Sequence, residues 1–392
     1  MYSWTRIFVG WLFYVGAGRT LQRLHSPTGE SLFAALNLIS IRFIVRIVCA
    51  SQKISPTEAD HLTILSIIIV VIHYGLLKRF GHRQDRSFWL AFLFPLFLLA
   101  TVKSLGLFLV GISFLAFRLS FAALEVRNGT ATFPSFAAYI SFALFAPTLN
   151  VGPISPLTTF QSPLPQTQGL ATQAVIRVLV GLAKFLVLAP LMDQISFQKV
   201  YSENAIHPPI DLAVACIATY LKIVLSFSGF CDIAIGTAGL LGIRVKENFN
   251  QPFAARNIKD FWNRQHITLS EYMQTIVFLP LTKTLIHRLG PQSAHWAIIL
   301  GITVVFSLIG LWHGLGWNFF LFGLTHAAGV TFNYLYGLGL KSLPRERLRA
   351  YQRSRTVHAV AVLLTFLFVS ATFLLFANSL AEIDRILRLT QL

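Results

Sequence analysis

Two histidines stand where an ordinary membrane span would not place them. His313 lies in GLWHGLGWNFFLFGLTHA (Gly310 to Ala327), at the junction of two apolar runs, and His266 closes the polar run ENFNQPFAARNIKDFWNRQH (Glu247 to His266). An ionisable side chain at membrane depth is costly, so it is by default a hypothesis of function. A neutral histidine in a partly dry site can take a proton from an attacking hydroxyl, which is general-base catalysis. His313 and His266 are therefore the candidate catalytic residues.

The neighbours of His313 fit such a site without requiring it. Gly310 and Gly314 would permit a broken helix or close backbone approach, and Trp312 could form a wall. A lone histidine in an apolar run can equally hydrogen-bond a neighbouring helix, so on pattern alone both interpretations stay open. His326 follows thirteen residues later and would point well away from His313 on a continuous helix. We interpret His326 as a packing histidine.

The polar run before His266 is more specific than a lone histidine. Five residues of chemical interest lie within seven positions, namely Asp260, Trp262, Asn263, Arg264 and His266. On a helix Asp260 and Arg264 share a face, as do Trp262 and His266. We interpret Asp260 with Arg264 as a structural ion pair. Asp232 follows Lys222 in an otherwise apolar run, and we expect a structural or cavity-lining role for it.

Composition identifies the class of protein. Of the 392 residues 55% are hydrophobic and only 12% are charged, whereas soluble domains carry roughly a quarter of charged residues. The net charge of +17 would suit a nucleic-acid ligand, but basic residues also gather in the cytoplasmic loops of membrane proteins. No aromatic and basic interleaving is visible, so we expect no nucleic-acid partner. The three cysteines do not have the spacing of a metal site. The sequence contains no GxSxG motif, so nothing in it argues for a covalent acyl-enzyme.

Apolar runs recur along the whole chain, most of them near the roughly 17 to 25 residues that a membrane helix needs. They cover residues 7–17, 32–50, 62–77, 88–102, 105–124, 136–151, 175–191, 210–227, 273–286, 296–311, 317–340 and 357–380. The first is a short span or a cleavable signal peptide. Arg42 and Arg46 share one helix face and are expected to extend to the lipid headgroups. We predict an all-α polytopic membrane protein of about 11–12 membrane helices in a single domain, residues 1–392.

The connecting segments indicate orientation. Basic residues crowd segments 78–86 and 341–355, which predicts that both are cytoplasmic. Segment 152–168 has no charged residue and is expected to be external. Counting crossings between these segments would place the basic insert 244–264 outside, so one segment must be re-entrant or cross only half the membrane. Irregular backbone at that depth is tolerated only against protein or a wet cavity, so we expect the insert to form a cavity wall.

Several motifs, in this order, resemble the membrane-bound O-acyltransferase family. They are GISFLAFR (Gly111 to Arg118), FAPTLNVGPI (Phe145 to Ile154), FSGFCDIAIG (Phe227 to Gly236), ENFNQPF, DFWNRQH and LWHG. The resemblance covers a family core of about residues 111–328. In the family the histidine of the WHG motif is catalytic, which maps onto His313. The histidine that closes the DFW motif, often an asparagine in eukaryotic members, maps onto His266.

The resemblance implies a membrane-embedded helical fold with a central tunnel. In it a cytoplasmic thioester donor, on a phosphopantetheine carrier protein or as acetyl-CoA, meets a hydroxyl acceptor from the lipid or external side, with no bound metal. His313 would deprotonate the acceptor, and His266 would position it or stabilise the tetrahedral oxyanion. The residues expected to bind substrate or line the tunnel are Asp232, Asn250, Trp262, Asn263, Arg264, Trp312 and Gly314.

Within the family, the length near 400 residues, EVRNG (Glu125 to Gly129) and WHGLGWNFFLFGLTHA look most similar to members that act in teichoic-acid D-alanylation. The longer members that O-acetylate alginate and other exopolysaccharides are a close second. Three positions depart from the usual pattern. Gln265 replaces a tryptophan, Ser155 and Pro156 follow GPI where a basic residue is usual, and Cys231 replaces a serine. These departures concern donor and acceptor specificity and leave the two histidines untouched.

The sequence therefore predicts an enzyme of the inner, cytoplasmic membrane. It would move a D-alanyl or acetyl group from a thioester to a hydroxyl of a cell-envelope polymer or exopolysaccharide. The expected partners are the lipid bilayer, an acyl-carrier protein or acyl-CoA, the envelope glycan and further envelope proteins. The alternative is a multi-pass transporter or flippase that uses its intramembrane histidines as a proton relay. Such a protein should show repeat symmetry, and the sequence shows none.

Overall fold

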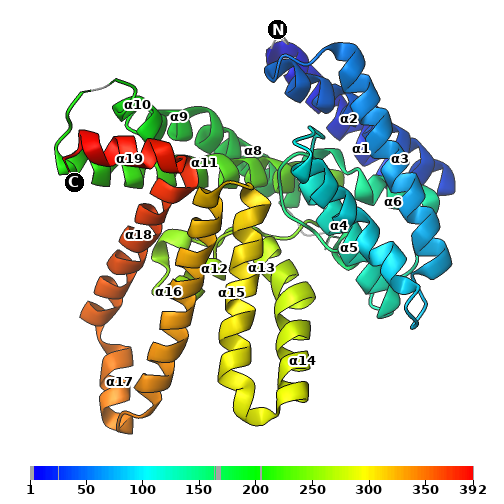
Figure 1. Cartoon of the computed structure of the whole chain (residues 1–392). Helices are drawn as coiled ribbons and strands as arrows, with labels where there is room; N and C mark the ends of the chain where they lie inside the picture. The colour runs from blue at the N-terminus through cyan, green and yellow to red at the C-terminus, as the bar shows by residue number, and fades with distance from the viewer. Residues whose placement is uncertain (1–3, 25, 163, 165–168, 204, 392) are drawn as a thin grey trace. The chain divides into compact units, whose positions relative to one another are not determined.

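The chain is a helical protein in which no β-strand occurs among the described residues (Figure 1). The computed structural model describes residues 4–24, 26–162, 164, 169–203 and 205–391, and the expected external segment 152–168 falls partly outside them. Contacts divide the chain into two compact units. The first comprises residues 1–182 and 229–247, and the second comprises residues 183–228 and 248–392.

The helices follow one another with short connections. The first unit contains α1 (Trp4–Arg23), α2 (Pro27–Ser51), α3 (Pro56–Phe80), α4 (Phe88–Ser104), α5 (Ile112–Arg127), α6 (Phe136–Ala143), α7 (Leu157–Gln161) and α8 (Leu170–Ala183). The second contains α9 (Ala189–Asp193), α10 (Phe197–Val200), α12 (Ile258–Trp262), α13 (Ile267–Met273), α14 (Leu279–Leu289), α15 (Ala294–His313), α16 (Trp317–Lys341), α17 (Arg345–Arg353), α18 (Arg355–Ala377) and α19 (Leu380–Leu389). Helix α11 (Pro209–Leu241) runs through both units.

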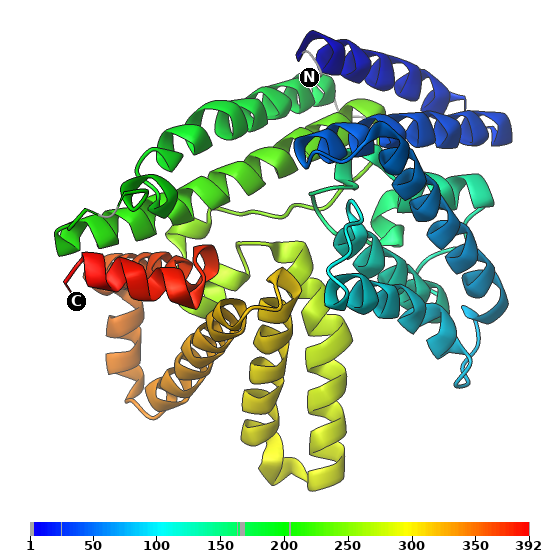
Figure 2. The same cartoon turned by 45° about the horizontal axis from the view of Figure 1, so that its top comes forward.

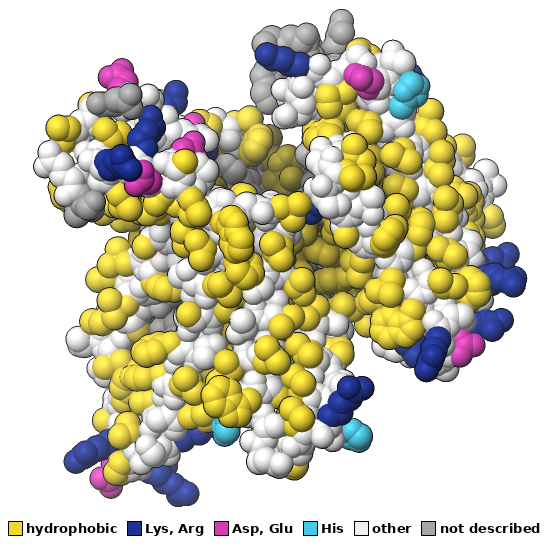
Figure 3. All heavy atoms as spheres, viewed as in Figure 1, with side chains coloured by type: hydrophobic (Ala, Val, Ile, Leu, Met, Phe, Trp, Pro, Cys, Tyr) yellow, Lys and Arg dark blue, Asp and Glu magenta, His cyan; other side chains and the backbone are white. Residues whose placement is uncertain are grey.

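Six described helices are long and apolar enough to cross a membrane. They span Pro27–Ser51, Pro56–Phe80, Leu170–Val200, Pro209–Leu241, Pro291–His313 and Arg355–Ala377. Hydrophobic side chains cover much of the visible face of α14, α15, α16 and α18, and basic side chains gather near α17 (Figure 3). Soluble proteins rarely expose apolar surface on this scale, because it should be buried from water. The prediction of an all-α polytopic membrane protein is confirmed, whereas the number of crossings, the half-crossing segment, the tunnel and the single domain stay predictions.

Several predicted runs have other bounds in the structure, and two of them lie in the family motifs. The run 105–124 becomes helical only at Ile112, because Gly111 adopts a left-handed φ of 71°. A Cβ atom there would lie 2.2 Å from the carbonyl oxygen of Leu149, so glycine is required. The run expected to end at Phe227 continues as α11 to Leu241. The carboxylate of Asp232, within this extension, is paired with Arg177 of α8.

Arg42 and Arg46 bind a carboxylate rather than extending to lipid headgroups, which corrects the expectation from sequence. Both lie on α2, and their Nε atoms donate to Oδ1 of Asp60 on α3 at 2.9 and 2.8 Å. Each guanidinium also donates from Nη2 to Oδ2, so both make charge-assisted, bidentate hydrogen bonds to the one carboxylate. The pairing was not visible in the sequence because Asp60 lies in the next helix.

Two other charged residues of the first unit organise the segments named as family motifs. The buried guanidinium of Arg118 donates to the carbonyls of Phe142 and Ala143 and to both oxygens of Thr148, at 2.7–3.0 Å. Buried polar groups are costly unless hydrogen-bonded, and these carbonyls lie where α6 has ended and offers no helical partners. Arg118 therefore holds the irregular FAPTLN segment in place.

Glu125 of the EVRNG run fixes the start of α7. Its carboxylate accepts hydrogen bonds from the backbone N–H groups of Leu157 and Thr158, at 2.7 and 3.2 Å. The first N–H groups of a helix have no partner within the helix, and a carboxylate also complements the positive end of the helix dipole. Glu125 thus caps α7 and has a structural role.

In the second unit α14, α15 and α16 lie side by side (Figures 1 and 2). Gly310 of α15 and Gly323 of α16 lie in close backbone contact. A Cβ atom on Gly310 would lie 2.3 Å from the carbonyl oxygen of Phe319, and one on Gly323 would lie 2.3 Å from that of Phe306. Small residues of this kind let two membrane helices pack backbone to backbone. His313 and His326 each follow one of these glycines by three residues.

The contact predicts the effect of adding a methyl group. Gly310→Ala or Gly323→Ala must push the two backbones apart, and we expect a loss of about 1–3 kcal/mol, as is usual for an overpacked interior. Gly337→Ala on α16 is the matched control, since a Cβ there meets nothing within 4 Å. Thermal unfolding of the purified protein in detergent is the measurement. Equal unfolding temperatures for all three variants would show that the close contact contributes nothing.

Candidate active site

His313 is the last residue of α15, where the chain turns to start α16. The Gly314 N–H donates to the carbonyl of Gly310 and ends the helix, and α16 begins three residues later at Trp317. The imidazole is half-buried, with the Phe376 ring centroid 4.8 Å away. The helix therefore breaks beside His313, as the glycines there permit, and the ring stands at the end of a helix rather than within one.

His266 lies at the start of α13 in a conformation that few residues adopt. Its φ of 51° and ψ of 46° are left-handed, and its side chain is only 6% exposed. Non-glycine residues in this region carry strain and often belong to functional sites. The turn is held by Asn248, whose carbonyl accepts from the Ile267 N–H and whose Oδ1 accepts from the Thr268 N–H. The backbone thus presents His266 rigidly.

The indole of Trp312 joins the two candidate histidines. Its ring centroid lies 5.7 Å from that of His266 and 4.6 Å from that of His313. The rings therefore share one aromatic site, formed by residues that lie far apart in the sequence. Burial, and then the charge of nearby His313, hold the pKa of His266 well below its usual range. Its ring is neutral at pH 7, and its Nδ1 meets no hydrogen-bond partner among the described residues.

The other candidates of the polar insert hold its shape. Arg264 Nε donates to Asp260 Oδ1 at 2.8 Å, which is the predicted ion pair. The Asn250 N–H donates to the Arg264 carbonyl, so the two ends of the insert pair as in a short hairpin. Asn263 is exposed, whereas Trp262 is buried and its indole N–H donates to His326. Of these residues, Trp262 is the one whose contacts lead to a helix beyond the insert.

Asp232 belongs to the first unit and pairs with a residue that the sequence did not single out. Arg177 of α8 donates from Nε to Asp232 Oδ1 at 3.1 Å and also bonds both carboxylate oxygens of Glu247. Arg177, Glu247 and Arg244 line a cavity of about 600 Å³ within this unit. Asp232 is thus tied to a cavity-lining arginine, and a role for it in substrate binding stays a prediction. Arg177 was missed because its partners lie 55 and 70 residues further along.

His326 lies closer to the surroundings of His313 than the sequence argument predicted. That argument assumed a continuous helix, but the break after His313 reverses the chain, and α16 returns along α15. The Phe322 ring lies 4.5 Å from His326 and 6.2 Å from His313, so the two imidazoles flank one aromatic residue. A signal existed in the sequence: both histidines close the same pattern, GLWH at Gly310 and GLTH at Gly323.

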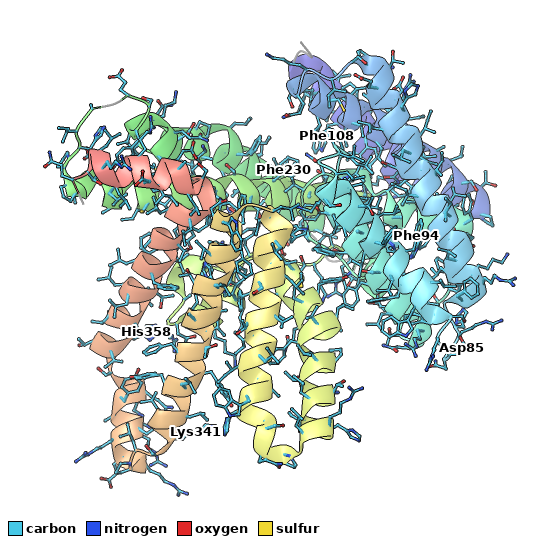
Figure 4. All side chains as sticks on the ribbon, in the orientation of Figure 1. Asp85, Phe94, Phe108, Phe230, Lys341 and His358 are labelled. Carbon is cyan, nitrogen blue, oxygen red and sulfur yellow. The ribbon has the colours of Figure 1, made fainter. Side chains whose placement is uncertain are left out.

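A second, larger cavity lies wholly within the second unit. It measures about 1500 Å³ and extends from the start of α12 along α16 and α18 to α17. Arg256, Lys259, Lys341 and His358 line it together with aromatic and aliphatic side chains, and no described carboxylate does. Lys341 and His358 mark its α17 end (Figure 4). The charge of the lining suits an elongated anionic ligand.

The described residues do not form a cluster of side chains that could bind a metal ion. No group of three or more of their histidine, cysteine, aspartate or glutamate side chains lies close enough to hold an ion. The described site offers imidazoles, an indole and apolar walls. Imidazoles can take and give up a proton near neutral pH.

Comparison with known proteins is consistent with this chemistry. Over 373 residues the chain is 26% identical to a teichoic acid D-alanyltransferase of Streptococcus thermophilus, covering 88% of each chain. It is 28% identical to a peptidoglycan O-acetyltransferase of Helicobacter pylori over 234 residues, 56% of this chain and 42% of that protein. It is 24% identical to an alginate O-acetylase of Pseudomonas putida over 314 residues, 79% of this chain and 62% of that protein.

The family model extends well beyond the motifs. Residues 30–377 match the model of the membrane-bound O-acyltransferase family, which includes the α15–α16 break and the polar insert with its short helix α12. The match is wider than the core of residues 111–328 expected from the motifs. The chain belongs to the membrane-bound O-acyltransferase family and is a multi-pass membrane acyltransferase.

Proposed function

We propose that this acyltransferase moves an acyl group from a cytoplasmic thioester to a hydroxyl of a cell-envelope polymer, with His313 as the base and His266 as its helper. The observation that carries the proposal is the aromatic site in which Trp312 contacts both imidazoles. Family membership favours acyl transfer over the transporter alternative. We place the enzyme in the cytoplasmic membrane, where a cytoplasmic donor and an external acceptor can meet.

The reaction balances with these groups alone. His313 takes the proton of the acceptor hydroxyl, and the oxygen attacks the thioester carbonyl to form a tetrahedral oxyanion. Neutral His266 carries one N–H, which donates to that oxyanion; such donors are worth several kcal/mol in a dry site. The intermediate collapses, the C–S bond breaks, and the leaving thiolate takes the proton from His313. The products are an ester and a free thiol.

The larger cavity of the second unit supports entry of the donor from the basic side. Its α17 end lies beside the arginine-rich segment 341–355, which is cytoplasmic by the distribution of positive charge. Its other end is the start of α12, the helix that closes with Trp262. A phosphate-bearing carrier arm or coenzyme would meet Lys341 and His358 first and then a largely apolar wall. Both expected donors, the phosphopantetheine carrier and acetyl-CoA, carry such phosphate.

D-alanyl is the acyl group that we propose first. The relative named as a D-alanyltransferase matches this chain over 88% of both lengths, whereas the alginate O-acetylase extends well beyond the match. Membranes holding the enzyme can be incubated with labelled D-alanyl carrier protein or with labelled acetyl-CoA. Transfer of the D-alanyl label to glycan supports the proposal, and transfer of only the acetyl label contradicts this choice of acyl group.

Removing the base should abolish transfer. We expect His313→Ala to lower kcat about 10²–10⁴-fold, the usual contribution of a positioned general base. His287→Ala, at an exposed histidine on α14, is the control and should keep full activity. Label transfer is measured beside thermal unfolding, so that loss of activity is separated from loss of fold. Full activity in a folded His313→Ala protein would mean that another residue is the base.

The backbone of His266 gives a second, independent test. Asparagine tolerates the left-handed conformation and can donate a hydrogen bond, whereas valine is β-branched and strained there. We expect His266→Asn to unfold near the wild-type temperature and to retain partial activity. His266→Val should lose both stability and activity, and His266→Gly should keep the fold but lose transfer. If the glycine variant turned over at the wild-type rate, the side chain would have no part in the reaction.

The basic end of the cavity predicts an effect on donor affinity. Lys341→Gln removes one charge worth roughly 1 kcal/mol near a surface, so KM for the phosphorylated donor should rise about fivefold with kcat nearly unchanged. Raising the salt concentration should shrink the difference, because salt screens exposed charges. Lys283→Gln, an exposed lysine of α14 outside the cavity, is the control. An unchanged KM for Lys341→Gln would place donor entry elsewhere.

A further inference from the structure

His326 is a buried polar residue for which the reaction above has no use. It lies in the middle of α16 with 1% of its surface exposed. Its ring is surrounded by aromatic side chains of four helices, namely Phe261, Trp262, Phe306, Phe322 and Phe368. A buried imidazole without hydrogen bonds would be costly, so both ring nitrogens need partners.

Both ring nitrogens of His326 have a hydrogen-bond partner. The indole N–H of Trp262 donates to Nδ1 of His326 across 3.2 Å, and Nε2 lies 3.1 Å from Oγ1 of Thr372 on α18. The Thr372 hydroxyl in turn donates to the carbonyl of Val369 at 2.6 Å. The result is a chain of hydrogen bonds that starts on α12, passes through α16 and ends on α18.

The donors in this chain fix the protonation of the ring. An indole N–H can only donate, so Nδ1 of His326 must be the bare, accepting nitrogen. The hydroxyl hydrogen of Thr372 is already used, so Nε2 must carry the proton and donate to Oγ1. His326 is therefore neutral, with its hydrogen on Nε2. A side chain that only filled the space could not make both bonds.

Trp262 connects this chain to the proposed active site. It ends α12 four residues before His266, and its carbonyl accepts a hydrogen bond from the Ser270 hydroxyl on α13, the helix that His266 begins. The turn between Trp262 and His266 is thus anchored at its first residue by His326. At its other end the His266 turn is held by Asn248.

The same helix also locates the base. Gly323 of α16 packs against Gly310 of α15, and His313 follows Gly310 by three residues. The position of His313 is therefore set by α16 at Gly323, and that of Trp262 is set by α16 at His326. These two fixed points are three residues apart on one helix.

We propose that His326 is a positioning residue, which holds Trp262, and through it His266, at a fixed place relative to His313. The proposal rests on the function proposed for those two histidines. His326 takes no proton from substrate and touches no reacting atom. Its effect is on the geometry of the pair, for which a displacement of about 1 Å can cost 10²-fold in rate.

Variants that each remove one hydrogen bond test the series that joins Trp262, His326 and Thr372. His326→Leu fills the space without hydrogen bonds, and we expect kcat to fall about 10²-fold while KM for the donor changes little. His326→Gln can both accept and donate, and it should recover much of the loss. Thr372→Val removes the acceptor of Nε2, and we expect a smaller fall in kcat. Thr282→Val, at another buried threonine that donates only within its own helix, is the matched control and should leave kcat unchanged.

A purely structural role would give a different result. It would lower the unfolding temperature and the fraction of active enzyme, with kcat per active molecule unchanged and with no advantage of glutamine over leucine. That outcome overturns the proposal. If His313→Ala abolishes transfer but folded His326→Leu keeps its kcat, the proposed function stands and the positioning role fails.

The ring itself provides a readout that does not depend on activity. In protein labelled with ¹⁵N in its histidine rings, the signals missing from the His326→Gln spectrum belong to His326. We expect one protonated and one bare nitrogen at pH 7, with the proton on Nε2, and we expect Trp262→Phe to shift the Nδ1 signal. A proton on Nδ1, or a doubly protonated ring, contradicts the hydrogen-bond chain even if the leucine variant fails to fold.

Discussion

At Gly310 and Gly323 two helices meet with no room for a Cβ atom on either side, and the rest of the site depends on this contact. Lipid surrounds helices with a medium as apolar as their own side chains, so burial alone gives helix pairing little specificity. A backbone contact adds specificity, because it forms only where both helices carry a residue without a side chain. This contact places the end of α15, and with it His313, beside a defined turn of α16. A steric constraint therefore contributes to the position of His313.

Charged side chains in the described part of the chain follow a second constraint, which is the need for a hydrogen-bond partner. In so apolar a chain a charge is tolerated where a partner neutralises it or satisfies its hydrogen bonds. Arg118 holds carbonyls that α6 leaves open, and Asp60 holds two arginines of the preceding helix. Their hydrogen bonds join helices and irregular segments, which is a structural role. The half-buried His313 and the strained His266 stay the proposed catalytic residues.

Much of the fold could be predicted because membrane helices are set by local properties. Length and apolarity identified α4, α15 and α18 within a few residues, since a span needs only a sufficient apolar run. Less could be predicted where a distant residue decides the structure. The extension of α11, the pairing of Arg177 with Asp232, and the left-handed turn at His266 depend on partners that periodicity does not reveal. The two catalytic candidates were found because they break the local pattern.

His326 shows how a correct local rule can mislead. The rule that thirteen residues on a helix turn a side chain away holds only while the helix continues, and the chain breaks directly after His313. Helix α16 returns along α15, and each histidine follows one of the two contact glycines by three residues. The position relative to these glycines therefore matters more than the thirteen residues between the histidines. In GLWH the imidazole lies at the end of α15, and in GLTH it lies in the protein interior. The half-buried His313 at the helix end can meet a substrate, whereas the buried His326 can only contact its neighbours. The same residue type is therefore the proposed base at one position and the proposed positioning residue at the other.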